Sequence, residues 1–188
     1  GTLHSGCRLF RDFPRYCVYL IKNIILEGIC INMVLNVSYF SHTGKVRKNN
    51  EDSLLVNDFL LSDSSTEDVG YLELKGEEFI VVVADGMGGH MRGELASRNV
   101  LEVFRERYRS MKDAEDIRET FRTAKERLNR IAEMDGESFG LGTTVSGVLF
   151  LEGNALIFNC GDSRVYRVTD GRLEKGTVDH SIVQELVD

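Results

Sequence analysis

The order of its segments predicts an α+β fold for this chain. Strand-like segments come first, two long amphipathic patterns follow, and several short strand-like segments with period two close the sequence. Helices that are grouped along the chain, instead of alternating with strands, are typical of α+β folds, and the two apolar stripes are suited to cover one face of a sheet. This order does not by itself decide between one sheet and two.

The first 32 residues differ in character from the rest of the chain. They carry the sole proline, Pro14, and three of the four cysteines, and they show no clean helical or strand period. We expect residues 1–32 to be an extension outside the fold, with Met33 as a natural start and residues 33–188 as the folded part. An amphipathic anchor or a partner-binding arm is the alternative interpretation of the extension.

Three strands are expected before the helices. Alternation over 34–41 would bury Val37 and Tyr39 on one face, and 52–61 and 71–84 also have strand composition. The acidic run 62–68 between the last two has loop chemistry. Within the third strand, the apolar run from Phe79 to Ala84 is typical of a strand buried on both faces, and it leads directly into Asp85.

Two helices and a set of short strands follow. The first helix carries apolar residues four apart, and the second extends from about Asp113, a plausible N-cap, to Met134. Strands are expected at 144–151, 155–160 and 163–168, then a hairpin turn at Asp170-Gly171 and a last helix from Ser181. The apolar positions of the helices are Ala96, Val100, Phe104 and Tyr108 in the first, and Ile117, Phe121, Ala124, Leu128 and Ile131 in the second.

Charge and composition exclude several classes of protein. Lys and Arg total 23 against 30 Asp and Glu, and the net charge of −7 argues against a nucleic-acid binder. No apolar run reaches the roughly 18 residues of a membrane span, so we expect no membrane partner. The cysteines show neither CxxC spacing nor a disulfide framework, which favours a reducing compartment and a cytoplasmic location.

Acidic residues stand where strands end or turn: Glu51 and Asp52, Asp85 before Gly86, and Asp162. Carboxylate and carbonyl oxygens are the ligands of Mg²⁺ or Mn²⁺ rather than Zn²⁺. Arg47, four residues before Glu51, would suit the oxygens of a phosphate, although it could equally form a surface ion pair. For Asp85, the alternative is a solvated aspartate in a simple strand-to-helix loop.

Taken in order, five motifs resemble those of the metal-dependent protein phosphatases of type 2C, and the DGMGGH form is similar to the bacterial branch. The resemblance covers about 34–188. The motifs are Arg47 to Ser53, Asp85 to His90 with Gly93-Glu94-Leu95-Ala96-Ser97 behind it, Gly142-Thr143-Thr144, Gly161 to Tyr166, and Asp179-His180-Ser181.

The resemblance implies an antiparallel β-sandwich flanked by helices in α-β-β-α order, and a serine/threonine phosphatase that hydrolyses phosphoproteins with an activated water. It implies that Asp85 bridges two Mn²⁺ or Mg²⁺ ions, that the Gly86 carbonyl ligates one, and that Glu51 and Asp52 hold their waters. Arg47 would bind the substrate phosphate, and Asp162 matches the aspartate that helps to hold a third ion. A cognate serine/threonine kinase is an implied partner.

Two departures from the family pattern stand in the sequence. Met87 occupies the place of a histidine proposed as general acid in many eukaryotic members. The family's two further metal-binding aspartates lie downstream of Asp179-His180-Ser181, so we expect a domain that is incomplete at its C-terminal side. Two other interpretations therefore stay open: an inactive phosphatase-like binding or regulatory module, and a hydrolase of small phosphate esters.

Overall fold

The computed structural model describes residues 20–21, 33–87, 92–134 and 141–180, which form two antiparallel sheets, a separate hairpin and two α-helices. The larger sheet has the order β4-β3-β6-β8-β9, with β7 paired to β6, and the smaller has the order β1-β2-β5. The strands are β1 (Leu20–Ile21), β2 (Met33–Tyr39), β3 (Asp52–Val56), β4 (Phe59–Leu61), β5 (Gly70–Gly76), β6 (Glu78–Met87), β7 (Gly142–Thr143), β8 (Val145–Leu151), β9 (Asn154–Cys160), β10 (Tyr166–Thr169) and β11 (Arg172–Lys175); the helices are α1 (Gly93–Arg107) and α2 (Ala114–Met134), with a 3₁₀ turn at Tyr108–Ser110 between them.

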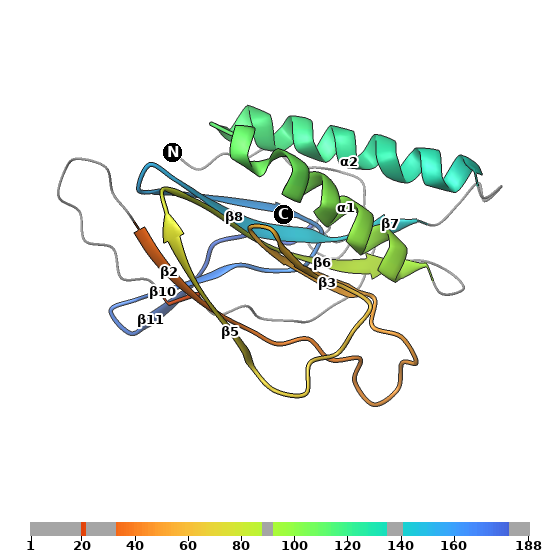
Figure 1. Ribbon diagram of the computed structural model, residues 1–188, viewed down its shortest axis with the longest axis horizontal. Coiled ribbons are helices and arrows are strands. Elements are labelled where there is room, and N and C mark those ends of the chain that lie inside the picture. The colour runs from red at the N-terminus through yellow and green to blue at the C-terminus, as the bar shows by residue number, and fades with distance from the viewer. Residues whose placement is uncertain (1–19, 22–32, 88–91, 135–140, 181–188) are drawn as a thin grey trace.

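The elements form three layers, with α1 and α2 on one face of the larger sheet and the smaller sheet against its other face (Figure 1). Strand β6 is central, and its side chains alternate between two apolar cores. Ile80 and Val82 pack under the helices, whereas Phe79 and Val81 pack against the smaller sheet. The α+β class and the strand buried on both faces are thus confirmed. Among the described residues, helices cover only the larger sheet.

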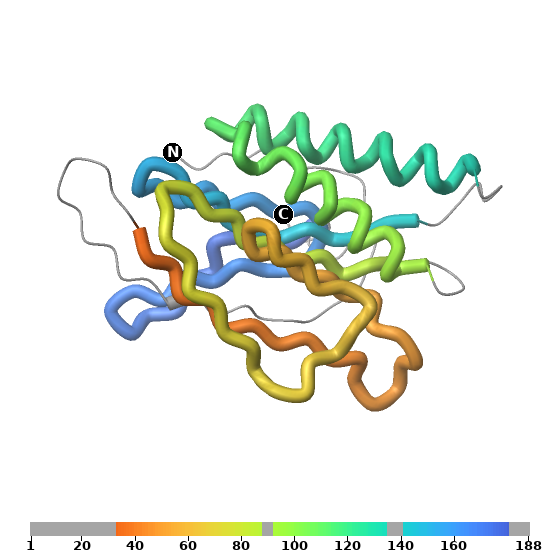
Figure 2. The backbone as a smooth tube through the Cα atoms, in the orientation of Figure 1, coloured from red at the N-terminus to blue at the C-terminus, as the bar shows by residue number. Residues whose placement is uncertain are grey.

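Two expected strands are in fact four, and this corrects the sequence analysis. The stretch 52–61 is the β3-β4 hairpin, because Asn57 takes the left-handed conformation (φ 51°) and exchanges hydrogen bonds with Ile80 instead of continuing the strand. The stretch 71–84 divides at Glu77, since β5 pairs in the smaller sheet and β6 in the larger (Figure 2). Periodicity alone cannot reveal that a chain changes sheets.

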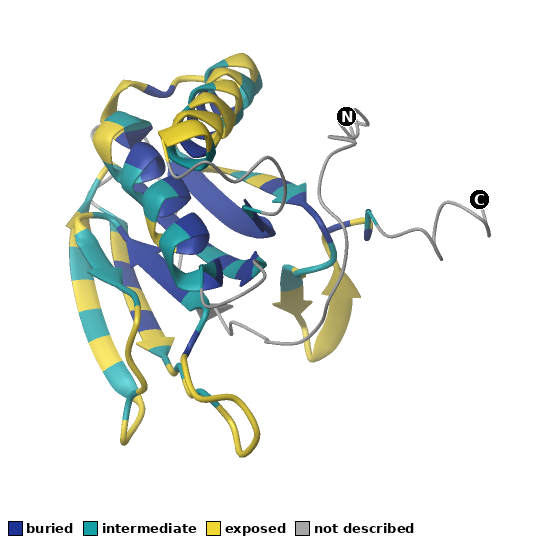
Figure 3. Cartoon of the chain, turned by 90° about the vertical axis from the view of Figure 1, so that its right-hand side faces the viewer, coloured by how far each residue is buried: buried dark blue, intermediate teal, exposed yellow. Residues whose placement is uncertain are grey.

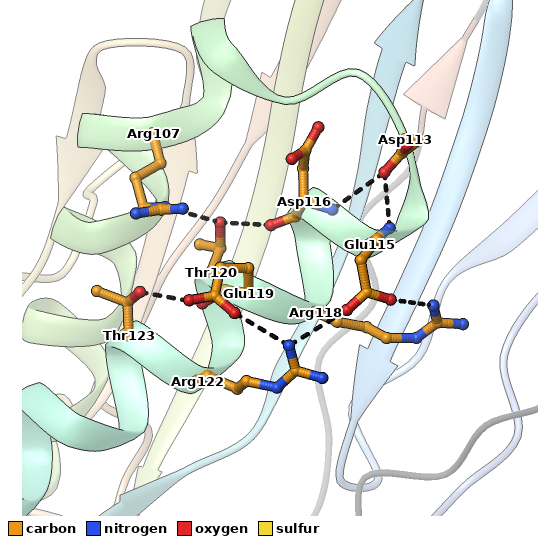
Figure 4. A network of polar contacts seen from close by, with 9 residues as sticks. All are labelled: Arg107, Asp113, Glu115, Asp116, Arg118, Glu119, Thr120, Arg122 and Thr123. Carbon is orange, nitrogen blue, oxygen red and sulfur yellow. Dashed lines mark hydrogen bonds and ion pairs between the residues drawn. The ribbon is translucent and has the colours of Figure 1, made fainter.

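The two helices agree with the predicted apolar stripes. All four stripe residues of the first pattern are buried, and Phe104 stacks on Phe158 of β9 with ring centroids 5.4 Å apart. Figure 3 shows this buried side of α1 turned to the sheet, and the β10-β11 hairpin exposed at the other side. Asp113 caps α2 as predicted, because its carboxylate accepts hydrogen bonds from the N–H groups of Glu115 (2.8 Å) and Asp116 (3.1 Å) (Figure 4).

The remaining expectations can be placed on the described residues. Val37 is buried and Tyr39 half-buried on β2, the 62–68 run is a mostly exposed loop, and Asp170 and Gly171 both have positive φ in the β10-β11 turn. Leu20 and Ile21 pair with β2 although they belong to the expected extension, whose boundary stays a prediction. The helix expected from 181 lies outside the described residues. No helix in the described ranges is long and apolar enough to cross a membrane.

Candidate metal centre

Two carboxyl groups meet at one end of the larger sheet. Asp52 at the start of β3 and Asp85 near the end of β6 are directly paired in the antiparallel register, and each carboxyl group affects the pKa of the other. Antiparallel pairing places such opposite side chains on the same face of the sheet. Two acidic residues 33 positions apart in the sequence are therefore brought together by the strand pairing alone.

Burial makes the charged form of this pair costly. Desolvation, together with the negative charges of Asp52 and Asp162, raises the pKa of Asp85 to about 7, while Arg47 opposes the rise. Desolvation likewise raises the pKa of Asp52 to about 6, against the opposing hydrogen bond from Asp85 and the charge of Arg47. Ionised carboxylates held together in this way are stabilised by a bound cation.

Glu51 and Gly86 are joined through their backbones beside this pair. The Gly86 N–H donates to the Glu51 carbonyl at 3.0 Å, and the buried Ser97 hydroxyl of α1 donates to the same carbonyl at 2.7 Å. Gly93, the first residue of α1, packs so closely that a Cβ atom there would lie 2.7 Å from the Gly86 carbonyl oxygen and 2.8 Å from the Glu51 carboxyl carbon. Since these oxygens converge where Gly93 has no side chain, the start of α1 shapes the centre.

Arg47 forms an ion pair with Glu51. Its side chain is 64% exposed, whereas that of Glu51 is 15% exposed, so the guanidinium lies at the solvent side of the acidic cluster. The loop that carries Arg47 is held by the buried Asn50, whose amide donates to the Ser41 hydroxyl and to the Ser64 carbonyl, each at 2.7 Å. The ion pair considered from the sequence thus forms, and its partner is a member of the predicted site.

Asp162 approaches from the loop between β9 and β10, close enough for its charge to raise the pKa of Asp85. Its neighbour Arg164 donates to both carboxylate oxygens of Asp179, each at 3.0 Å from Nε. The His180 N–H donates to the Gly161 carbonyl at 2.9 Å. His90 and the two glycines before it lie outside the described residues.

The donor atoms fit a hard divalent cation. They are the Asp85 and Asp52 carboxylates, the Gly86 carbonyl and the Glu51 carboxylate, all of which are oxygens. Within the described ranges, no group of three or more His, Cys, Asp or Glu side chains is close enough together to hold an ion by itself. A cation here would therefore be completed by the carbonyl and by water, which suits Mg²⁺ or Mn²⁺ better than Zn²⁺.

A cleft of about 260 Å³ lies beside this centre, between β2 and the strands β3 and β6. Asp52, Asp85 and Ser163 line one part of it, while apolar side chains of the three strands form most of its wall. The acidic centre therefore opens onto space that is largely apolar.

Several positions that shape the site had no role assigned from the sequence. Gly93 and Ser97 belong to the motif that follows Asp85, and Ser53 is the last residue of the motif that begins at Arg47. The hydroxyl groups of Ser53 and Ser97 lie 2.9 Å apart. The sequence predicts only that Thr144 begins a strand. Their common signal is only that they are small or bear a hydroxyl group, which is too frequent in proteins to assign a role without the fold.

Comparison with known proteins gives a consistent result. The family described as Protein phosphatase 2C matches residues 60–182. The serine/threonine phosphatase stp of Listeria welshimeri is 29% identical over 160 residues, which are 81% of this chain and 58% of that protein. The serine/threonine protein phosphatase PstP of Mycobacterium tuberculosis is 31% identical over 165 residues, 84% of this chain and 27% of PstP. The chain thus spans less than two thirds of the length of these relatives.

Solved structures agree with these sequence matches. The crystal structure of the PstP catalytic domain in complex with two manganese ions has a TM-score of 0.62 at 28% identity, over 82% of this chain and 59% of that one. Stp1 of Staphylococcus aureus also has a TM-score of 0.62 at 28% identity, over 89% of this chain and 61% of that one. The antiparallel sheets and paired helices described above are thus shared with solved bacterial phosphatases.

Proposed function

The chain belongs to the protein phosphatase 2C family, and on this premise we propose that it is part of a metal-dependent serine/threonine protein phosphatase. The observation that carries the proposal is the pairing of Asp52 with Asp85 across β3 and β6, with Arg47 and Glu51 beside them. Metal-dependent hydrolysis of a phosphate ester needs carboxylates that hold metal ions and, beside them, a positively charged side chain that binds the phosphate. This end of the sheet has both.

Each site residue has a role in the proposal. Asp85 and the Gly86 carbonyl hold the cations directly, and Glu51 and Asp52 hold water molecules around them. Asp162 contributes to a further ion, because its charge is close enough to raise the pKa of Asp85. These roles are supported by the donor set, which consists of oxygens alone. They are also supported by the relative PstP, whose catalytic domain has been solved in complex with two manganese ions.

Arg47 binds the phosphate of the substrate in this proposal. Its side chain is largely exposed while it pairs with Glu51, so N–H groups on another edge of the guanidinium can donate to an incoming phosphoryl group. Two bound divalent cations would supply the acidity that activates a water and would offset charge on the phosphoryl oxygens. The protein's own share is to hold Asp52 and Asp85 fixed on paired strands, so that little rearrangement accompanies the reaction.

The proposed substrates are phosphorylated proteins, and a serine/threonine kinase that produces them is the proposed partner. Relatives of this chain are named as serine/threonine phosphatases, which supports phosphoserine and phosphothreonine as the groups removed. A cytoplasmic site of action is proposed from the cysteines, which lack the spacing of a disulfide framework. Among the described residues, the cysteine Cys160 is buried.

Hydrolysis of a phosphothreonine peptide, with and without Mn²⁺, tests the proposal. We expect the unaltered chain to release phosphate in the presence of Mn²⁺, and Asp85→Asn to release none. The circular dichroism spectrum of Asp85→Asn should show that the variant is still folded. Asp68→Asn, which changes an exposed aspartate in the 62–68 loop, is the matched control. Turnover that persists in Asp85→Asn would contradict the role of Asp85, and a folded chain that binds Mn²⁺ without any turnover would contradict the activity.

A further inference from the structure

Thr144 connects the backbone of Asp85 to the loop that carries Asp162. The Asp85 N–H donates to Thr144 Oγ1 at 3.1 Å, and the Thr144 N–H donates to the Asp85 carbonyl at 2.9 Å. The same hydroxyl lies 2.6 Å from the hydroxyl of Ser163, the residue after Asp162. One side chain therefore contacts both segments from which the acidic groups arise.

This connection is buried and tightly packed. Thr144 is 1% exposed, so its hydroxyl has protein groups in place of water as partners. Gly161 packs on its other side with φ +106°, and a Cβ atom at Gly161 would lie 2.8 Å from Thr144 Cγ2. The loop 161–163 thus rests directly on Thr144.

The far side of the same loop is also fixed. The Asn159 amide donates to the carbonyl of Gly161 at 3.0 Å and to that of Val178 at 2.9 Å. The His180 N–H adds a second hydrogen bond to the Gly161 carbonyl. The loop is therefore held from behind by these groups, while on its front side Ser163 contacts the Thr144 hydroxyl that accepts from the Asp85 N–H.

We propose that Thr144 is a positioning residue that sets the separation between the carboxyl groups of Asp85 and Asp162, with the Ser163 hydroxyl as its partner. The inference rests on the proposed function, since the purpose of this separation is to hold divalent cations. Groups that orient metal ligands typically change metal affinity by about 10- to 100-fold when they are removed. Thr144→Val keeps the shape of the side chain but removes the hydroxyl, and leaves the Asp85 N–H without its acceptor.

Two measurements on the whole chain test the proposal. Isothermal titration with Mn²⁺ gives the dissociation constant, and amide hydrogen exchange of Asp85 in chelator reports the hydrogen bond without any metal. We expect Thr144→Val to weaken Mn²⁺ binding about 10-fold or more and to speed exchange at Asp85. Thr144→Ser, which keeps the hydroxyl, should restore both values to within about twofold of the unaltered chain.

Thr120→Val is the matched control, because Thr120 is fully buried and its hydroxyl bonds to Asp116 and Arg107 in the helices, away from the site (Figure 4). It should leave Mn²⁺ affinity and Asp85 exchange unchanged, whatever its effect on stability. Equal changes in Thr144→Val and Thr120→Val would overturn the proposal, as would a Thr144→Val chain with unchanged exchange and affinity.

Ser163→Ala keeps the inference testable where Thr144→Val does not fold. It removes the second hydroxyl and leaves the bond between Thr144 and Asp85 in place, so we expect weaker Mn²⁺ binding with normal exchange at Asp85. Unchanged Mn²⁺ binding in Ser163→Ala would overturn the proposal in that case. If the unaltered chain binds no Mn²⁺, the proposed function fails, and the exchange of Asp85 in Thr144→Val or Thr144→Ser still decides whether Thr144 orders the segment.

Discussion

Replacing Asp85 by asparagine should stabilise the metal-free protein at alkaline pH and remove its stabilisation by Mn²⁺. In the folded chain, burial and the negative charges of Asp52 and Asp162 raise the pKa of Asp85 from 3.8 to about 7. The folded state therefore retains a proton that the unfolded state releases from about pH 4 upward. The stability that this proton confers is complete below pH 4 and is lost as the pH rises through 7.

The size of the effect follows from that difference. At 1.36 kcal/mol per pH unit, a rise from 3.8 to about 7 amounts to roughly 4 kcal/mol between acid and alkaline pH. Because the side chain is half-buried, solvent screening reduces the expected gain from Asp85→Asn to about 2 to 4 kcal/mol at pH 8. For a chain of this length, that corresponds to an increase in melting temperature of at least about 4 °C.

Thermal denaturation followed by circular dichroism measures this gain. The unaltered chain, Asp85→Asn and the exposed control Asp68→Asn are compared at pH 4 and pH 8, in chelator and with excess Mn²⁺. We expect Asp85→Asn to melt higher than the unaltered chain only at pH 8 in chelator. Mn²⁺ at 100 times its dissociation constant should stabilise the unaltered chain by about 2.7 kcal/mol and should leave Asp85→Asn unaffected.

Two results would refute this reasoning. An Asp85→Asn chain that is no more stable than the unaltered one at pH 8 in chelator would show that the carboxylate is not strained by burial and by its acidic neighbours. A gain of equal size at pH 4 and pH 8 would show that the effect of the substitution does not come from the charge.

Three further predictions concern the core, the cap of α2 and the substrate. Phe104→Ala should lower the free energy of unfolding by about 3 to 5 kcal/mol in urea titrations, because Phe104 is fully buried and stacks on Phe158. The control Phe40→Ala, at a 54% exposed position, should lower it by less than about 0.5 kcal/mol. Similar losses at the two positions would contradict the assigned core. Asp113→Ala should cost about 1 kcal/mol of stability and Asp113→Asn much less, so that equal losses in the two variants would argue against the cap. Arg47→Ala should mainly raise KM for a phosphothreonine peptide, measured by phosphate release; a fall in kcat at unchanged KM would remove substrate binding from its role.

Much of the fold could be predicted because its signals are local. The four-residue spacing before Tyr108 and the cap at Asp113 correspond to buried and capping residues in α1 and α2. The apolar run from Phe79 to Ala84 is indeed a central strand, and the turn at Asp170-Gly171 has the left-handed conformation that its residues favour. Side-chain period and turn chemistry act over a few residues, so they can be read directly from the order of amino acids.

The acidic residues of the candidate site could be selected from the sequence, but their arrangement in space could not. The motifs single out Asp52, Asp85 and Asp162 by their neighbours in the sequence. Their convergence depends on the register of β3 on β6 and on the hydroxyl contacts of Thr144, which join residues up to 59 positions apart.

The sequence by itself therefore determined the helices, the central strand, the family motifs and the chemical type of the site. Only the tertiary structure decided that 52–61 and 71–84 each divide into two strands, that the strands form two sheets, and that Gly93 and Thr144 shape the acidic centre. The physical reason is that sheet partners and close packing are selected by the burial of the whole chain, whereas periodicity and turns are set by adjacent residues.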